Sequence, residues 1–438
     1  MDRQPGGYDH ENNQALEMFR HNLHGLYSSV HHFPEKPNVM HVLIAFDKFK
    51  DALTAEEACA AAKAGVLESH PDWTVECLPI SDGGEGFAIS LTKALGGEVR
   101  TTSVTGPRGD TLKARWGILN LDTLPDTIRK EYNLPGYGKL ALLDMAEASG
   151  LQQLSEDARN PWETTTLGTG ELIAHAFEAG AQTIILGVGG SATNDLGVGA
   201  LQALGLKLLD DQGQPLNPAT PRQWDRVVRL SEGVWPGLPD IRIACDVTNP
   251  LLGPNGATQT FGPQKGLPFD EINVLEKAVG RMAKLLCAFF DKPRTLMMEQ
   301  GTGAAGGLPF GLMLACDATL TSGASLVHRW LDMDERIKQA DLVISGEGRI
   351  DQGTLQGKGP GALAARASAL GKPVYLFGGA VDPNVGKMGD ALTTCAITPA
   401  DMPLSEALSQ SAVLLEQAIS NHFRNSPPRF GSNRISFT

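Results

Sequence analysis

Basic residues are scarce relative to acidic ones in this chain of 438 residues, with 37 lysines and arginines against 50 aspartates and glutamates. The formal net charge of −13 argues against two classes of partner, nucleic acids and anionic membrane surfaces. The sequence also lacks any apolar run of about 18 residues, as a membrane span would need, and its start lacks the apolar core of a signal sequence. We therefore expect a cytoplasmic protein whose partners are small molecules, with no membrane or nucleic-acid partner.

Cysteine is sparse and scattered, and the six cysteines never form a C-x-x-C pair. Each lies in an apolar stretch, which is typical of a small core residue in a reducing compartment. Several site signatures are missing as well, namely the P-loop, the protein-kinase motifs, the nucleophile elbow and zinc-ligand spacing. Residues 301–306 match G-x-G-x-x-G, but no clear strand precedes them, so we expect close helix packing there and no dinucleotide site.

Glycine, in contrast, is abundant, with 50 residues, and it gathers where predicted strands end. The clearest case is GVGGSATN at residues 187–194, which follows a β-branched apolar run and precedes an apolar pattern of helical spacing. Glycines let backbone N–H groups approach an anion closely, and a helix N-terminus adds positive potential. Taken alone, the pattern is equally typical of a tight turn between a strand and a helix.

The same order of strand, polar glycine-bearing loop and helix recurs along the chain and predicts an α/β fold with parallel sheets. The length favours two domains. Residues 98–119 alternate around the turn Gly-Pro-Arg-Gly and predict an antiparallel hairpin, whereas residues 120–139 are turn-rich and predict a loop. The strands expected in the recurring units are 41–46, 74–80, 140–145, 183–186, 241–246, 341–345 and 374–378.

Acidic side chains follow several of these strands, and a few basic side chains accompany them. Mg²⁺ prefers oxygen ligands, usually one or two carboxylates plus substrate phosphates, and a further carboxylate can accept the proton of an attacking hydroxyl. Each acid taken singly is as readily a helix cap or a surface charge. Together they favour a metal-dependent enzyme acting on a phosphate or nucleotide substrate, because ligands bind beyond the carboxyl ends of strands in such sheets.

Many stretches, in order along the chain, resemble the type-1 glycerate kinase family, over about residues 39–422. They include PISDGGEG at 79–86, TTLGTGELI at 165–173, GVGGSATN at 187–194 and SGEGRID at 345–351. The resemblance implies ATP-dependent phosphorylation of D-glycerate, usually at O2, to give 2-phosphoglycerate. It also implies a Rossmann-like domain with a second α/β domain inserted into it. One departure is Lys48, where the family usually has serine after the aspartate.

The resemblance sets the expected domain boundaries. Residues 39–96 and 300–424 would form the discontinuous Rossmann-like domain, and residues 97–299 the inserted α/β domain. Residues 1–38 would be an N-terminal extension and residues 425–438 a C-terminal tail, since both lie outside the resemblance.

The strand-end loops supply the predicted site residues, with ATP and Mg²⁺ as cofactors. Asp195 is predicted as the catalytic base, with Asp82 as the alternative, and Lys50 as a third catalytic residue. Glu347 and Asp351 are the predicted metal ligands. The residues expected to bind substrate or phosphate are Asp47, Gly83, Gly84, Glu85, Gly189, Gly190, Ser191, Asn194, Asp246, Asn249, Lys265 and Arg349. Arg349 is expected to hold the substrate carboxylate, with a structural ion pair to Glu347 or Asp351 as the alternative.

Other functions stay open on the sequence alone. The same fold could phosphorylate glycerate at O3, or act on another small hydroxy acid. A non-catalytic sensor of glycerate or nucleotide is a different class, and the intact acids on the loops disfavour it. The sequence leaves open the stereochemistry of the acceptor and whether the chain forms a homo-oligomer.

Overall fold

The computed structural model describes residues 39–80, 84–355, 359–383, 385 and 392–425. The chain separates into two compact units, Met1–Val39 and Met40–Thr438, and the elements below all lie in the second. The predicted extension at 1–38 and nearly all of the predicted tail lie outside the described residues. Within the described part, no helix combines the length and the apolar character that crossing a membrane requires.

The first large sheet has five parallel strands in the order β13-β12-β11-β1-β2. The chain adds β2 on one side of β1 and then places β11 on the other side. This reversal makes the boundary between β1 and β11 the topological switch point, where open α/β sheets bind ligands. The strands are β1 (His41–Phe46), β2 (Thr74–Cys77), β11 (Leu342–Ile350), β12 (Val374–Val381) and β13 (Leu392–Ala396).

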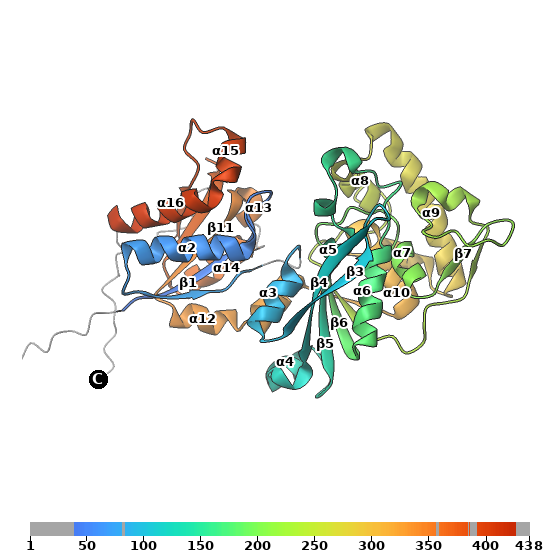
Figure 1. Ribbon diagram of the computed structural model, residues 1–438, viewed down its shortest axis with the longest axis horizontal. Coiled ribbons are helices and arrows are strands. Elements are labelled where there is room, and N and C mark those ends of the chain that lie inside the picture. Colours follow the sequence, from blue (N-terminus) through green and yellow to red (C-terminus); the bar gives the residue numbers. More distant parts are fainter. Residues whose placement is uncertain (1–38, 81–83, 356–358, 384, 386–391, 426–438) are drawn as a thin grey trace, which may run out of the picture. The chain divides into compact units, whose positions relative to one another are not determined.

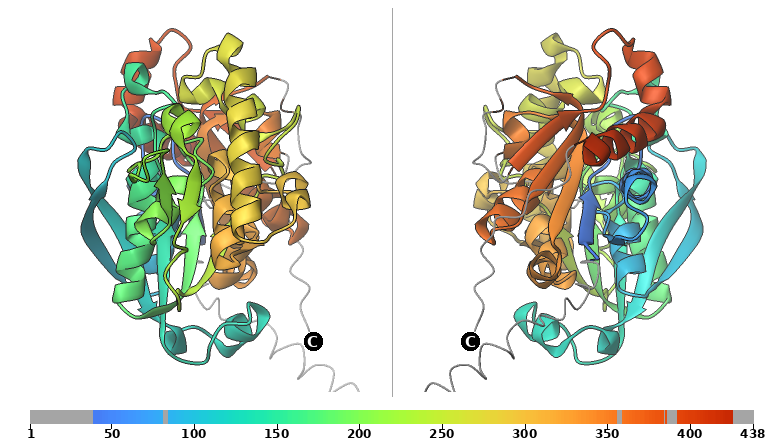
Figure 2. Two further views of the ribbon diagram at one scale, coloured as in Figure 1. Left: turned by 90° about the vertical axis from the view of Figure 1, so that its right-hand side faces the viewer. Right: turned by 90° about the vertical axis from the view of Figure 1, so that its left-hand side faces the viewer.

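Strand β1 is apolar on both faces, which is why it lies in the middle of a sheet covered by helices on both sides. Val42 and Ile44 face α2 (Ala55–Ser69) and α16 (Ser411–Asn425), while Leu43 and Ala45 face the opposite layer. Figures 1 and 2 show α2 and α16 side by side over this sheet. The opposite layer contains α11 (Gly323–Trp330), α12 (Met333–Gln339) and α14 (Gly359–Ala369).

The second large sheet has six strands in the order β10-β9-β6-β5-β4-β3. Four of them are parallel, and the hairpin predicted from the Gly-Pro-Arg-Gly turn supplies the antiparallel strands β3 and β4. A separate pair, β7 (Lys207–Leu209) and β8 (Arg229–Ser231), is antiparallel. The strands of the six-stranded sheet are β3 (Glu98–Thr105), β4 (Thr111–Asn120), β5 (Lys139–Asp144), β6 (Ala181–Gly187), β9 (Asp240–Ala244) and β10 (Thr319–Thr321).

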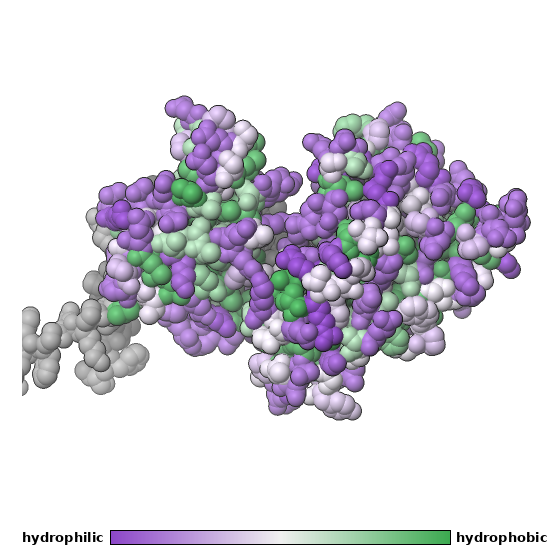
Figure 3. Space-filling view, viewed as in Figure 1, coloured by the Kyte–Doolittle hydropathy of each residue, from purple (hydrophilic) through white to green (hydrophobic). Residues whose placement is uncertain are grey.

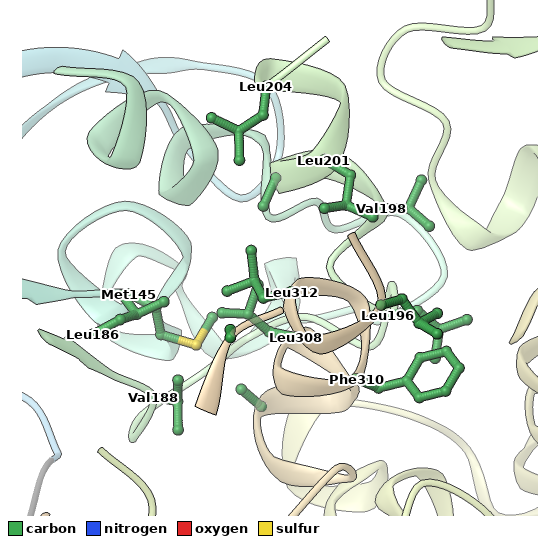
Figure 4. Close-up of a cluster of buried hydrophobic side chains, with 14 of the residues drawn as sticks. Met145, Leu186, Val188, Leu196, Val198, Leu201, Leu204, Leu308, Phe310 and Leu312 are labelled. Carbon is green, nitrogen blue, oxygen red and sulfur yellow. The ribbon is translucent and has the colours of Figure 1, made fainter. Parts of the chain in front are cut away.

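The glycine-rich turn after β6 is held by a buried apolar cluster. Figure 4 shows Leu196, Val198 and Leu201 gathered with Leu308 and Leu312, which come from a helix far along the chain. The helices between β2 and β10 in the chain are α3 (Phe87–Ala94), α4 (Asp126–Glu131), α5 (Ala146–Ser149), α6 (Leu167–Glu178), α7 (Val198–Ala203), α8 (Ala257–Phe261), α9 (Ile272–Phe289) and α10 (Leu308–Cys316). Two further helices, α13 (Gln352–Leu355) and α15 (Leu404–Ser409), come after β11.

The mixed α/β fold with parallel sheets is confirmed, but several local predictions differ from the structure. The strand expected at 341–345 continues to Ile350 as β11, so Glu347 and Arg349 lie within the strand and not in a loop after it. Residues 120–139 were expected to be a loop, yet they contain α4, because Leu124, Ile128 and Leu134 bury their side chains. The short strand β10 was not expected. It lies after residue 300, in the range predicted for the Rossmann-like domain, but it pairs with β9, which lies in the range predicted for the inserted domain. The predicted domain boundaries stay a prediction.

The visible face in Figure 3 is mostly hydrophilic, with hydrophobic side chains in small separate groups. The G-x-G-x-x-G stretch is an interior turn: a Cβ on Gly303 would lie 2.1 Å from the carbonyl oxygen of Pro250. A Cβ on Gly306 would lie 2.1 Å from the carbonyl oxygen of Thr193. These glycines allow the turn to pack closely on the backbone of two other loops, whereas close packing of a helix was expected here.

Candidate functional site

The carboxyl end of β1 and the part of β11 beside it bring two predicted carboxylates to the switch point. Phe46 pairs with Gly346, and the N–H of Asp47 donates to the carbonyl oxygen of Gly346 at 3.0 Å. Asp47 and Glu347 are therefore neighbouring positions across two strands. Gly359 at the start of α14 approaches the same point, because a Cβ there would lie 3.2 Å from Oδ2 of Asp47. Two carboxylate positions and a helix N-terminus thus meet at this edge.

The loop after β1 directs two lysines into a cavity. Phe49 and Leu53 form an isolated antiparallel bridge, and Asp51 takes a left-handed conformation with φ of 61° to close the turn between them. Phe49 itself is buried against Phe46. This anchoring leaves Lys48 and Lys50 on the wall of a cavity of about 840 Å³.

Three of the predicted site residues, Lys50, Glu85 and Gly190, line this cavity. Nζ of Lys48 lies 2.8 Å from Oε2 of Glu85, so the carboxylate of Glu85 is paired with a basic side chain that the sequence analysis did not assign to the site. Gly190 has φ of 71° and is exposed, as expected for a glycine that lets a ligand approach the backbone.

The glycine-rich turn is fixed by the chain that follows β5. The N–H of Leu151 donates to the carbonyl oxygen of Gly190 at 2.8 Å, and the N–H of Ala192 donates to that of Ser149 at 2.9 Å. Ser191 is buried in the bridge with Gly150. The turn, including Gly189, is therefore preformed, while the hydroxyl of Ser191 lies mostly away from solvent.

Asp195, the predicted base, is 1% exposed and accepts four hydrogen bonds. The backbone N–H and hydroxyl of Thr166 donate at 2.8 and 2.9 Å, and the N–H groups of Gly197 and Gly199 donate at 3.2 Å each. Burial raises the pKa of the Asp195 carboxyl, and these hydrogen bonds oppose the rise. The contacts favour a role in tying the start of α7 to the start of α6, and the role of base stays a prediction.

Lys265 and Asn194 also lie beneath the turn and do not line the cavity. Lys265 is 1% exposed, and its Nζ donates to the carbonyl oxygen of Thr193 at 2.6 Å. Desolvation lowers the pKa of the Lys265 ammonium to about 7, which the charge of Asp195 partly offsets. Asn194 donates to the hydroxyl of Thr258 at 3.0 Å. Both predicted phosphate ligands are thus held inside the protein in this structure.

Asp246 and Asn249 are engaged in local structure. Asp246 accepts from the hydroxyl of Ser322 at 2.7 Å and from the N–H of Ala324 at 2.9 Å, which caps the start of α11. Asn249 donates to the carbonyl oxygen of Asn255 at 2.8 Å. Neither residue lines the cavity that contains Lys50 and Gly190.

Arg349 and Asp351 come close together at the end of β11. Oδ1 of Asp351 accepts from the N–H of Gly353 at 2.8 Å, and its Oδ2 lies 3.6 Å from Nε of Arg349. Arg349 also lies 3.9 Å from Asp382, and its side chain is 67% exposed. The guanidinium predicted to hold a substrate carboxylate therefore already has two carboxylates beside it.

The loop after β2 is described only in part. Asp82 and Gly83 lie outside the described residues. Gly84, which follows them, accepts a hydrogen bond from the N–H of Phe87 at 3.1 Å and so begins the turn into α3.

Besides Lys48, the sequence analysis missed Asp144 and Arg159 in the site region. Asp144 ends β5, is 1% exposed and accepts from the N–H of Ala88 at 3.1 Å, and burial raises the pKa of its carboxyl. Its position after an apolar strand was the same signal that identified Asp47. Arg159 lines the cavity from an irregular segment, and no local pattern could have identified it.

The described residues contain no group of three or more histidine, cysteine, aspartate or glutamate side chains that could hold a metal ion. A divalent cation at the switch point would therefore need oxygen ligands from a bound phosphate group in addition to protein carboxylates. This is the mixed ligand set that Mg²⁺ takes with nucleotides.

A model of the glycerate kinase family matches residues 42–426. The chain is 38% identical over 382 residues to the glycerate kinase of Bacillus subtilis (strain 168), which covers 86% of this chain and 95% of that protein. It is 40% identical over 354 residues to the glycerate 2-kinase of Escherichia coli (strain K12), which covers 79% of this chain and 87% of that protein.

The fold has a solved counterpart as well. A crystal structure of a Salmonella typhimurium LT2 protein, provisionally named glycerate kinase 2, is similar with a TM-score of 0.67 and 35% sequence identity. The similarity covers 88% of this chain and 97% of that chain. The range that the family model matches, residues 42–426, includes strands of both large sheets and all the residues that line the cavity.

Proposed function

Because this chain belongs to the glycerate kinase family, we propose that it transfers the γ-phosphoryl group of ATP to D-glycerate, at O2, to give 2-phosphoglycerate. The identity of 40% to a protein named glycerate 2-kinase supports the choice of O2 over O3. The main structural support is that loops after β1 and after β6 line one cavity, which brings Lys48 and Lys50 to the same space as Gly190. Small molecules are the partners, and a homo-oligomer stays a prediction.

Binding of the ATP phosphates is the task proposed for the loops at this cavity. Backbone N–H groups of the turn at 187–194 would donate to phosphate oxygens, and Lys50 would offset the charge that develops on the transferred group. This division suits an acidic protein, since anion binding must then come from local groups near Gly190 and Lys50.

Magnesium is proposed as the metal that accompanies ATP, where it would neutralise charge on the phosphates. Glu347 and Asp351 would hold it, with Asp47 on the neighbouring strand end. One oxygen of Asp351 is committed to the turn at Gly353, so a cation would bind at Oδ2, where it would compete with Arg349 at 3.6 Å. The donor set fits an ion whose remaining ligands come from phosphate and water.

The acceptance of a proton from the glycerate hydroxyl is the remaining task. Two carboxylates, Asp195 and Asp82, are candidates on sequence. Because four donors already engage Asp195, we propose Asp82 as the base and Asp195 as a residue that positions the turn.

The test is an assay of ADP release with purified protein, ATP, Mg²⁺ and D-glycerate. We expect ADP formation that depends on both glycerate and Mg²⁺, is abolished by EDTA and returns when excess Mg²⁺ is added. ADP formation without glycerate would indicate a different acceptor. Binding of glycerate and ATP without any ADP would overturn the proposal in favour of a sensor.

A further inference from the structure

Four basic side chains line the cavity, and they differ in how their charge is compensated. Lys48 pairs with Glu85 at 2.8 Å, and Arg115 pairs with Glu147 at 2.7 Å. The other two, Lys50 and Arg159, form no ion pair with any residue in the described part of the chain. Lys50 is exposed to water, whereas Arg159 is half-buried.

Arg159 also has an unsatisfied donor. Its Nε is buried and finds no acceptor among the described residues. An N–H group that leaves water without gaining an acceptor destabilises the folded protein, and more so on a charged group. A guanidinium with an unsatisfied N–H on the wall of a cavity would therefore be stabilised by binding an anion there.

The backbone of Arg159 is fixed, so its side chain starts from a defined place. The N–H of Arg159 donates to the carbonyl oxygen of Glu156 at 3.3 Å. Its own carbonyl packs on Gly266, where a Cβ would lie 2.3 Å from that oxygen. Gly266 and Gly190 line the same cavity, which places Arg159 in the space that the proposed substrates would share.

From these observations we propose that Arg159 is the residue that binds the carboxylate of glycerate. The proposal rests on the proposed function and identifies the part of the site that receives the acceptor. A guanidinium presents parallel N–H groups that match a carboxylate in two hydrogen bonds. Arg349, the residue predicted from sequence for this task, is mostly exposed and already has Asp351 and Asp382 beside it.

The experiment compares Arg159→Gln and Arg159→Lys with the wild type in steady-state kinetics. We expect Arg159→Gln to raise KM for D-glycerate by about 10- to 100-fold, while KM for ATP changes less than about twofold. Arg159→Lys keeps the positive charge but loses the paired N–H groups of the guanidinium. Its KM for D-glycerate should lie between the values of the wild type and Arg159→Gln. Millimolar guanidinium chloride should partly restore glycerate binding to Arg159→Ala, which a purely structural role would not allow.

A matched control is Arg108→Gln. Arg108 contacts the same segment, donating to the carbonyl oxygen of Ala158 at 3.4 Å, but pairs with Glu163 at the surface. We expect its KM values to match the wild type. A second readout is glyceramide, which lacks the negative charge: the preference of the wild type for glycerate over glyceramide should shrink in Arg159→Gln.

Several outcomes would overturn the inference while leaving the proposed function intact. A rise in KM for ATP equal to or larger than that for glycerate would make Arg159 a phosphate ligand. Unchanged KM values in a folded Arg159→Gln would remove it from binding altogether. If Arg159→Gln does not fold, an unchanged KM for glycerate in Arg159→Lys together with no guanidinium rescue of Arg159→Ala would overturn it. Failure of the wild type to turn over glycerate would instead contradict the proposed function.

Discussion

The buried pair of Lys265 and Asp195 lies beneath the turn that is proposed to receive phosphate. Lys265 holds the carbonyl oxygen of Thr193, and Asp195 holds the N–H groups of Gly197 and Gly199. Lys265 thus fixes the turn by donating to one of its carbonyl oxygens, and Asp195 fixes the start of α7 by accepting from two of its N–H groups. Their effect on activity would come through the shape of the turn.

The pH dependence of stability tests the state of Lys265. The pKa of its ammonium is about 7 in the folded protein and 10.5 without perturbation, so between these values the unfolded chain holds a proton that the folded chain lacks. The free energy of unfolding must then rise with pH across this window, by at most about 1.4 kcal/mol per pH unit. Below about pH 7 the cost of burying the charge is fully present.

Urea unfolding of the wild type and Lys265→Met at about pH 7 and about pH 9 measures this effect. We expect the difference in free energy of unfolding to move by about 2 kcal/mol in favour of the wild type at the higher pH. Lys284→Met, on the exposed side of α9, should show no such change. Parallel pH profiles for the wild type and Lys265→Met would show that Lys265 keeps an ordinary pKa.

Replacing each candidate base distinguishes a residue that stabilises the fold, whose loss lowers Tm, from a catalytic base, whose loss lowers kcat. Asp195→Asn loses an acceptor for buried N–H groups, so we expect a lower Tm, about 2–4 kcal/mol less stability and a kcat reduced less than tenfold at a temperature where it stays folded. Asp82→Asn should keep the wild-type Tm and lose about 10²–10⁴-fold in kcat. The opposite pattern, an unchanged Tm with an inactive Asp195→Asn, would restore Asp195 as the base.

At the level of elements, the contact between α2 and α16 depends on one glycine. A Cβ on Gly65 would lie 2.4 Å from the carbonyl oxygen of Glu416 in the facing helix. The two helices can therefore approach only because position 65 has no side chain. This contact covers one face of β1, whose carboxyl end carries Asp47.

The sign of the change in the free energy of unfolding of Gly65→Ala tests this contact. Helix propensity alone would stabilise the variant by about 1 kcal/mol, whereas the clash should destabilise it by about 1–3 kcal/mol. We expect a net loss of stability in thermal or urea unfolding. Ala64→Gly, at the exposed neighbouring position, should cost only the propensity difference of about 1 kcal/mol. A Gly65→Ala protein more stable than the wild type would contradict the close contact.

Elements with long apolar runs or distinct turns could be predicted from the sequence. Strands β1 and β6 follow from β-branched runs, and the β3–β4 hairpin follows from its turn at 106–109. Helix α4 was missed because it has six residues and buries only Ile128 among turn-forming residues, and β10 because it has only three residues. Short elements owe their form to tertiary contacts, which the local pattern does not contain.

The position of the site could be predicted, but the direction of its side chains could not. Parallel strands end at one edge, so acids that follow them gather there whatever the detailed packing. Whether an acid then faces a cavity or a helix start depends on which N–H groups lie nearby. Asp195 and Asp246 turn to helix starts, while Arg159 reaches the cavity without following any strand.

At the scale of the whole molecule, loops that follow strands of two different sheets line one cavity, which we propose as the site. The five-stranded sheet supplies its switch point with Asp47 and Glu347, and the six-stranded sheet supplies the turn at Gly190. The family match over residues 42–426 spans both. Phosphoryl transfer needs a place for the nucleotide and a place for the acceptor within reach of each other, and in the proposed site both would lie in this cavity.

The most direct test of the account is the identity of the product. Purified protein should be incubated with ATP, Mg²⁺ and D-glycerate, and the mixture examined by proton-coupled ³¹P NMR. We predict a new phosphomonoester signal that the single hydrogen on C2 splits into a doublet, as expected for 2-phosphoglycerate, in amounts equal to the ADP formed, whereas the two hydrogens on C3 of 3-phosphoglycerate would give a triplet. A phosphomonoester attached at C3, or ADP without any phosphorylated glycerate, would contradict it.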